Sequence, residues 1–184
     1  MKPSSFQKNV VNVEGYLGRW YDIAHTRSFF QPPGGFNTTA TYTLNGDNSI
    51  NVFNNTYYVK DNKIYNFNVV GNAVPLNQRG DNYKLSFQPS PTGLPTNPDD
   101  PMIYKPSPTM EESTSCYNII YLVYDDSRNY DVEYVYSLVT GCPPNALYLL
   151  SRIPYPPKEH VMSLLTWAKD NGFNTDVDFT PHYL

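Results

Sequence analysis

The feature that most constrains the fold of this chain is a series of eight short segments in which apolar and polar side chains alternate. Alternation with a period of two residues is typical of strands that bury one face, and turn residues separate the segments. Because most of the connections are short, we expect an antiparallel meander in chain order. We place the eight strands at 19–25, 38–44, 49–58, 64–73, 82–88, 117–125, 133–139 and 146–152.

The composition agrees with a mostly β protein and excludes several kinds of partner. Seventeen tyrosines bring the aromatic content to 15%, and only 16% of the residues are charged, which favours half-buried pleated surfaces. A formal net charge of −4 leaves no basic surface for nucleic acid. We find neither an apolar run long enough for a transmembrane segment nor the apolar core of a signal peptide. Peripheral contact with a membrane stays open.

A single helix is predicted after the last strand. Pro157 suits a first-turn position and Gly172 suits the C-terminal cap. Apolar residues between them recur at helical spacing and form one face. We therefore expect a helix over about 157–171 that packs on the outside of the sheet. The apolar face consists of Val161, Leu164, Leu165 and Ala168.

Eight antiparallel strands followed by a helix can close into a barrel wide enough for one small ligand. Three stretches, YLGRWYDIA at 16–24, ATYTL with SINVFN within 40–54, and YSLVTGCPPNALYLLSRIP at 136–154, resemble the lipocalin family. Within that family they are similar to the branch of bacterial outer-membrane lipocalins and apolipoprotein D. The resemblance implies an all-β, eight-stranded up-and-down barrel. We expect one domain over 1–184, with the barrel at about 14–154.

The resemblance also implies a structural plug at one end of the barrel. The first strand starts at the end where the last strand finishes, so Trp20 and Arg152 are expected to converge there. Lipocalins place this tryptophan beneath the closed end of the cavity with the arginine guanidinium across it, a cation–π contact worth ~1 to 2 kcal/mol. We therefore predict structural roles for both residues.

Alternation then predicts which side chains face the barrel interior. The phase follows from Trp20 and Arg152 in the outer strands and from the more apolar parity elsewhere. Such a lining suits an elongated apolar molecule with a small polar end, unless the side chains simply fill the barrel. The predicted ligand-binding set is Asp22, Ala24, Tyr42, Phe67, Val69, Leu85, Phe87, Ile119, Tyr121, Val123, Ser137, Val139 and Tyr148.

Asp22 is the one acid in this set. A carboxylate that faces the interior is costly unless it is hydrogen-bonded. We interpret it as a structural residue paired to tyrosines or backbone, with a ligand or proton site as the alternative.

The opposite end of the barrel is expected to be the mouth. The long proline-rich loop 89–115 and a loop that contains Phe29 and Phe30 fall at this end. Stiff proline segments and large apolar rings can cover an entrance at small entropic cost, so both are candidate lids. The alternative for 89–115 is a disordered insertion without a role.

Two cysteines fit a bridge beside the mouth. A hairpin centred near Asn129 would pair Cys116 with Cys142, because each lies 13 residues from that centre. Relatives in the branch named above usually place their disulfides differently, so the pairing depends on strand register alone. A bridge would indicate an oxidising compartment, and hence a secreted or extracytoplasmic protein. Two reduced thiols are the alternative.

No catalytic or metal-binding arrangement emerges from the sequence. His25, His160 and His182 are dispersed over a strand, the helix and the tail, and we expect all three at the surface without a metal. We expect no cofactor and no enzymatic activity. The predicted function is to bind and transport or sequester a small hydrophobic ligand, such as a fatty acid, lysolipid, retinoid or sterol-like molecule. The alternatives are an enzyme of the same fold that acts on a lipid or pigment, or a module that binds a protein through its loops. The oligomeric state stays open.

Overall fold

The computed structural model describes residues 10–26, 34–87, 114–141 and 146–183. Their strands match the predicted ones to within a few residues at each end. A short helix before the first strand and a ninth strand near the C-terminus were not predicted. The elements are α1 (Val13–Tyr16), β1 (Gly18–Thr26), β2 (Phe36–Leu44), β3 (Ile50–Lys60), β4 (Lys63–Pro75), β5 (Asn82–Phe87), β6 (Thr114–Tyr124), β7 (Tyr134–Thr140), β8 (Leu147–Ser151), α2 (Lys158–Asp170) and β9 (Val177–Phe179).

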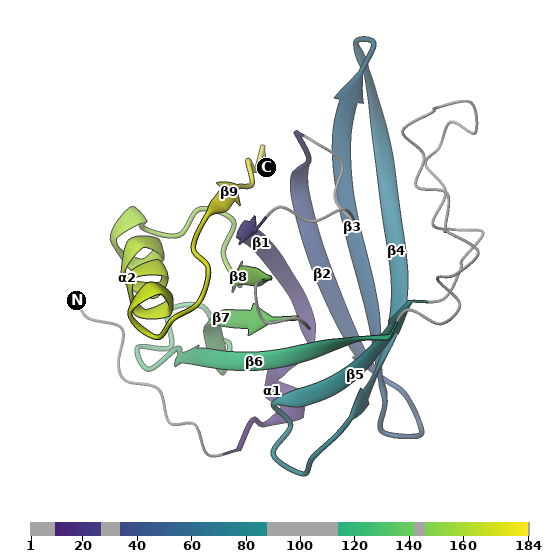
Figure 1. Ribbon diagram of the computed structural model, residues 1–184, viewed down its shortest axis with the longest axis vertical. Helices are drawn as coiled ribbons and strands as arrows, with labels where there is room; N and C mark the ends of the chain where they lie inside the picture. Colours follow the sequence, from purple (N-terminus) through teal and green to yellow (C-terminus); the bar gives the residue numbers. More distant parts are fainter. Residues whose placement is uncertain (1–9, 27–33, 88–113, 142–145, 184) are drawn as a thin grey trace.

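The first eight strands form a closed antiparallel barrel with up-and-down order, as predicted. Each strand pairs with the next along the chain, and β1 closes the barrel by pairing with both β2 and β8. The longest hairpin joins β3 to β4, where eleven residue pairs lie in continuous register. This hairpin extends well beyond the neighbouring strands in Figure 1.

The C-terminal segment completes the wall between β1 and β2. These two strands pair only from Gly18 to Tyr21 of β1, after which β2 diverges. β9 pairs with β1 from Ala24 to Thr26 on the edge that β2 has left. The next residues reach β2, because Asn37 donates its backbone N–H to the carbonyl of Pro181 at 2.9 Å. The tail thus satisfies backbone groups on both strands.

Two register shifts change which side chains face the interior. In β1 the pairing with β8 shifts between Asp22 and Ala24, and in β6 the pairing with β7 shifts between Ile119 and Tyr121. Each shift adds one residue to the strand, as a β-bulge does. Because side chains alternate with a period of two, an extra residue moves the following side chains to the opposite face.

Two apolar clusters lie on the two faces of the barrel wall. The first fills the barrel around Trp20, Tyr42 and Leu150. The second lies outside, where α2 packs across β6, β7, β8 and β1, and Figure 1 shows α2 beside β7 and β8. The helix begins directly after Pro157 and is followed by Gly172 at φ +85°. Its buried face, Val161, Leu164, Leu165 and Ala168, is the predicted one.

Neither helix of the described ranges is long and apolar enough to span a bilayer.

Candidate functional site

The closed end of the barrel is built around Trp20 and Arg152. The guanidinium carbon lies 4.0 Å from the centre of the Trp20 ring, within the range of a cation–π contact. Arg152 also donates from Nη1 to the carbonyl of Arg19 at 2.7 Å and from Nη2 to the carbonyl of Leu17 at 2.7 Å. Trp20 is fully buried and donates from Nε1 to the carbonyl of Tyr16 at 2.9 Å. The two residues therefore hold α1 under the barrel, and the predicted structural geometry is confirmed.

The structure explains why a glycine, Gly18, precedes this tryptophan by two residues. Its φ is +95°, a conformation that side chains with a Cβ rarely adopt. A Cβ at this position would lie 3.3 Å from Nη1 of Arg152. The glycine thus provides both the turn from α1 into β1 and the space for the guanidinium.

Above the plug lies a network of hydroxyl groups, which we call the tyrosine floor and define as Tyr16, Tyr42, Tyr117 and Ser137. The Tyr16 hydroxyl lies 2.7 Å from that of Tyr117 and 2.9 Å from Ser137 Oγ. The Tyr42 hydroxyl lies 2.9 Å from that of Tyr117. Burial raises the pKa of Tyr16 to about 12 and raises the pKa values of Tyr42 and Tyr117 well above 10. The floor is therefore uncharged at physiological pH.

The wall between the floor and the mouth is mainly apolar. Val52, Leu85 and Val139 belong to the interior cluster, and Phe87 packs against it. Phe67 and Val69 belong to a separate cluster with Tyr58 and Tyr65 on the β3–β4 hairpin. One neutral polar pair interrupts the wall, because the hydroxyls of Thr38 and Thr56 lie 2.6 Å apart and are both buried.

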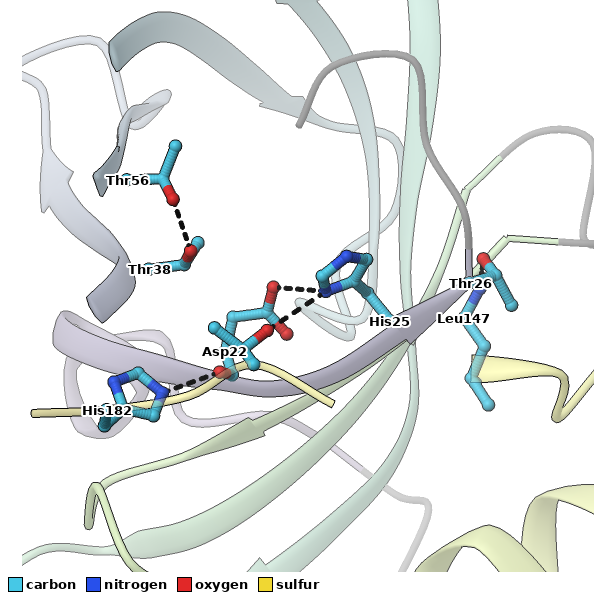
Figure 2. A network of polar contacts seen from close by, with 8 residues as sticks. Asp22, His25, Thr26, Thr38, Thr56, Leu147 and His182 are labelled. Atoms are coloured by element: carbon cyan, nitrogen blue, oxygen red, sulfur yellow. Dashed lines mark hydrogen bonds and ion pairs between the residues drawn. The ribbon is translucent and has the colours of Figure 1, made fainter. Parts of the chain in front are cut away.

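An acid and a histidine lie side by side on the same wall. Asp22 Oδ2 is 2.8 Å from Nδ1 of His25 (Figure 2), and the two side chains are 5% and 14% exposed. Burial lowers the pKa of His25, but the hydrogen bond to Asp22 and the charges of Asp22 and Asp178 outweigh it. The pKa of His25 is therefore raised above its ordinary value of 6.5. His25 also stacks on Tyr148, with ring centroids 6.5 Å apart.

The C-terminal tail supports this pair from behind. His182 Nε2 donates to the carbonyl of Asp22 at 2.8 Å, and Figure 2 shows it on the side away from His25. Thr180 Oγ1 lies 3.3 Å from Nδ1 of His25. His182 is only 8% exposed. The expectation that the histidines lie at the surface is therefore wrong for His182 and for the largely buried His25.

Most of the predicted lining residues do face the interior. They belong to the interior cluster or to the hairpin cluster, or they pair with residues of these clusters. Their role in ligand binding stays a prediction. The set comprises Asp22, Tyr42, Phe67, Val69, Leu85, Phe87, Ile119, Ser137, Val139 and Tyr148.

Three predicted lining residues are instead on the outer face, so their predicted orientation was wrong. Ala24 and Val123 belong to the cluster beneath α2. Tyr121 packs on Trp167 of α2, with ring centroids 4.4 Å apart. Each of the three follows a register shift in its strand, which reverses the alternation counted from Trp20 or Ile119.

The same shifts bring residues into the interior that alternation did not predict. His25 takes the inward position expected for Ala24, and Leu122 belongs to the interior cluster in place of Tyr121. Tyr16 was missed for a different reason, because it lies on α1, a helix of four residues that carries little sequence signal. Tyr117 could have been found, since it has the same parity as Ile119 on the undisturbed part of β6.

Several predictions concern residues beyond the described ranges. The candidate lid residues Phe29 and Phe30, nearly all of loop 89–115, and Cys142 lie there. Cys116 is on β6, and Asn118 pairs with Thr140, which agrees with the predicted hairpin centre because both lie 11 residues from position 129. The bridge itself stays a prediction.

Metal ligands do not gather in the part of the chain that the structure describes. There, no three His, Cys, Asp or Glu side chains lie close enough together to hold an ion.

Comparison with known proteins gives consistent matches over nearly the whole chain. The family profile of the lipocalin-like domain matches residues 11–181. Temperature-induced lipocalin-1 of Arabidopsis thaliana is 32% identical over 165 residues, which cover 89% of this chain and 75% of the relative. The crystal structure of the major allergen Per a 4 from cockroaches aligns with a TM-score of 0.58 at 13% identity, covering 99% of this chain and 95% of that one. The last match concerns the fold alone.

Proposed function

The chain belongs to the lipocalin family, and we propose that its barrel binds a small hydrophobic molecule between the tyrosine floor and the mouth. In this proposal the protein transports or sequesters the molecule and does not transform it. The bound molecule is elongated and mainly apolar, because the wall above the floor consists mainly of aliphatic and aromatic side chains.

The observation that carries this proposal is that some inward-facing side chains away from the closed end are accessible, although the base of the barrel is packed. Near the closed end the interior is packed, since Trp20, Tyr134 and Leu150 are at most 4% exposed. Nearer the mouth, inward-facing side chains such as Val69 and Tyr148 are only half-buried. A side chain that faces the inside of a closed barrel stays accessible only where neighbouring side chains leave space. These accessible positions support a filled base with space for a ligand above it.

Adjacent residues of β4 provide a matched test. Val69 faces the interior, whereas Val70 pairs with Phe53 on the outer face. We expect Val69→Trp to weaken binding of a neutral fluorescent probe, N-phenyl-1-naphthylamine, at least tenfold by occupying the space beside the wall. Val70→Trp adds the same side chain outside and should bind like the unchanged protein.

The experiment is a fluorescence titration, supported by native mass spectrometry of the protein with its co-purified molecules. Absence of any saturable apolar ligand would contradict the proposal. Equal loss of affinity in the two tryptophan variants would place the ligand elsewhere.

The same proposal includes an oxidised Cys116–Cys142 bridge at the mouth and a secreted or extracytoplasmic location. Register supports the bridge, because two residues beyond the Asn118–Thr140 pair on each strand are the two cysteines. A bridge that persists in the mature protein would fit an oxidising compartment.

A further inference from the structure

The inner wall of the barrel carries very little charge. Among the described residues that face inward between the floor and the mouth, the only carboxylate and the only basic side chain are those of the Asp22–His25 pair. Arg152 lies below the floor, with its guanidinium on the carbonyls beneath Trp20. Lys60 and Lys63 pair at the far tip of the β3–β4 hairpin. This tip is roughly 20 Å along the strand, at ~3.3 Å per residue, from Asn54, which pairs with Ala40 beside Trp20. No described cation is thus hydrogen-bonded to the floor, although the charge of Arg152 reaches Tyr16 and Tyr42 from below.

The floor itself can donate or accept a hydrogen bond without being charged. Its four hydroxyls, from Tyr42 through Tyr117 and Tyr16 to Ser137, share three hydrogen bonds. Each hydroxyl has one hydrogen, so three are used within the chain and one is left over at one end. Because hydroxyls rotate, the direction of the chain can reverse. The floor can thus offer a donor or an acceptor to a ligand.

A carboxylate would be poorly accommodated in the same place. It would lose its hydration on entering the barrel and would find neutral hydroxyls in place of a cation. It would also approach the Asp22 carboxylate. Burial is the main cause of the raised pKa of Tyr42, but the charge of Asp22 raises it further and outweighs the opposing charge of Arg152. An alcohol or a ketone pays a smaller desolvation cost and can pair with the hydroxyls.

We propose that the end of the ligand that enters the barrel is uncharged and carries a hydroxyl or carbonyl oxygen, so that the site selects alcohols and ketones over carboxylic acids of the same skeleton. Asp22 is a specificity-determining residue in this proposal, because its carboxylate opposes an anion at the floor, whereas the Nδ1 of His25 is already directed at Asp22. The inference rests on the proposed function and narrows it: retinol-like and sterol-like molecules fit, whereas fatty acids and retinoic acid do not.

Matched ligand pairs separate this proposal from the proposed function. The assay measures how well each ligand displaces N-phenyl-1-naphthylamine from the full chain at pH 7.4. The two pairs are retinol with retinoic acid, and hexadecanol with hexadecanoate. We expect each neutral member to bind at least tenfold more tightly than its acid. Equal or tighter binding of the acids would overturn the proposal while leaving the binding function intact. Failure of the probe and of all four ligands to bind would instead contradict the proposed function.

Two variants test the roles assigned to the residues. Asp22→Asn removes the inner negative charge and should reduce the preference for the neutral ligands at least fivefold, mainly by tighter binding of the acids. Glu159→Gln removes an exposed negative charge in the first turn of α2 and should leave the preference unchanged. An Asp22→Asn protein that folds but keeps the full preference would show that Asp22 does not set it.

Tyr117→Phe provides an independent test that does not depend on the folding of Asp22→Asn. It removes the central hydroxyl of the floor, which lies within hydrogen-bond distance of two others. We expect retinol to bind at least fivefold more weakly while the affinity for retinoic acid stays within twofold. Equal effects on both ligands, checked on protein with an unchanged circular dichroism spectrum, would overturn the role of the floor.

Discussion

Replacement of Arg152 by methionine tests the plug at the closed end most sharply. The side chain of methionine keeps much of the apolar stem but removes the guanidinium. In the structure, this group makes four hydrogen bonds to backbone carbonyls, at 2.7 to 3.1 Å. It also contacts the face of Trp20 at 4.0 Å. We expect the variant to fold with a clear loss of stability.

The magnitude follows from these contacts. A hydrogen bond from a charged donor is worth about 1.5 to 3 kcal/mol, and the cation–π contact about 1 to 2 kcal/mol. These contributions are not additive, and the arginine is half-buried, so water can replace part of what is lost. We therefore expect a decrease of about 3 kcal/mol in the free energy of unfolding. For a chain of this size, this corresponds to a decrease in Tm of roughly 8 °C.

Urea unfolding followed by circular dichroism measures the effect. Arg19→Met is the matched control, because the Arg19 side chain is exposed at the same end of the barrel and contributes only its backbone carbonyl to the plug. We expect the control to change stability by less than about 0.5 kcal/mol. A loss below about 1 kcal/mol for Arg152→Met, or equal losses for both variants, would refute the structural role of the arginine.

Three further predictions concern the helix, the buried histidine and the cysteines. Leu164→Ala should lower the free energy of unfolding by about 2 to 5 kcal/mol in urea titrations, because Leu164 is 2% exposed on the buried face of α2. Met162→Ala, at a 46% exposed position of the same helix, should change it little. Similar effects of the two substitutions would contradict the packing of the helix. Protonated His25 stabilises the fold because its pKa is raised: the contribution is complete below about pH 6.5 and is lost as the pH rises through the raised value. In urea titrations from pH 6 to 9, the free energy of unfolding should therefore fall more steeply for the unchanged protein than for His25→Gln. Identical pH dependence of the two proteins would count against the ion pair. Alkylation of the unfolded, unreduced protein should modify neither Cys116 nor Cys142, and two alkylated thiols would rule the bridge out. The bridge closes a loop of about 27 residues, so its reduction should lower the free energy of unfolding by about 3 to 4 kcal/mol.

The strand order could be predicted from the sequence because the residue pattern of each strand identifies it without reference to distant parts of the chain. Alternation and turn residues located all eight barrel strands, and helical spacing located α2 with its buried face. The register at the start of the β6–β7 pair also followed from the hairpin centre. These features depend on residues that are close together in the sequence, so local sequence patterns are sufficient to predict them.

The parts of the site that sequence reasoning missed depend on distant contacts. The bulges after Asp22 and Ile119 are set by pairing with β8 and β7, and nothing in their own strands marks them. His25 was therefore placed at the surface, although it lies against Asp22 on the inner wall. The role of the tail was equally hidden, because β9 has three residues and its place depends on where β2 leaves β1.

The central claim, that an apolar ligand lies inside the barrel, can be tested directly by methyl NMR with a saturating ligand such as retinol. Methyl groups on the inner wall, for which Val52, Val69 and Val139 are reporters, should shift and show intermolecular NOEs to the ligand. Methyl groups of Leu147 and Leu149, which lie on the outer face beneath α2, should show neither. NOEs confined to the outer methyl groups, or saturable binding without NOEs to the inner ones, would contradict the account.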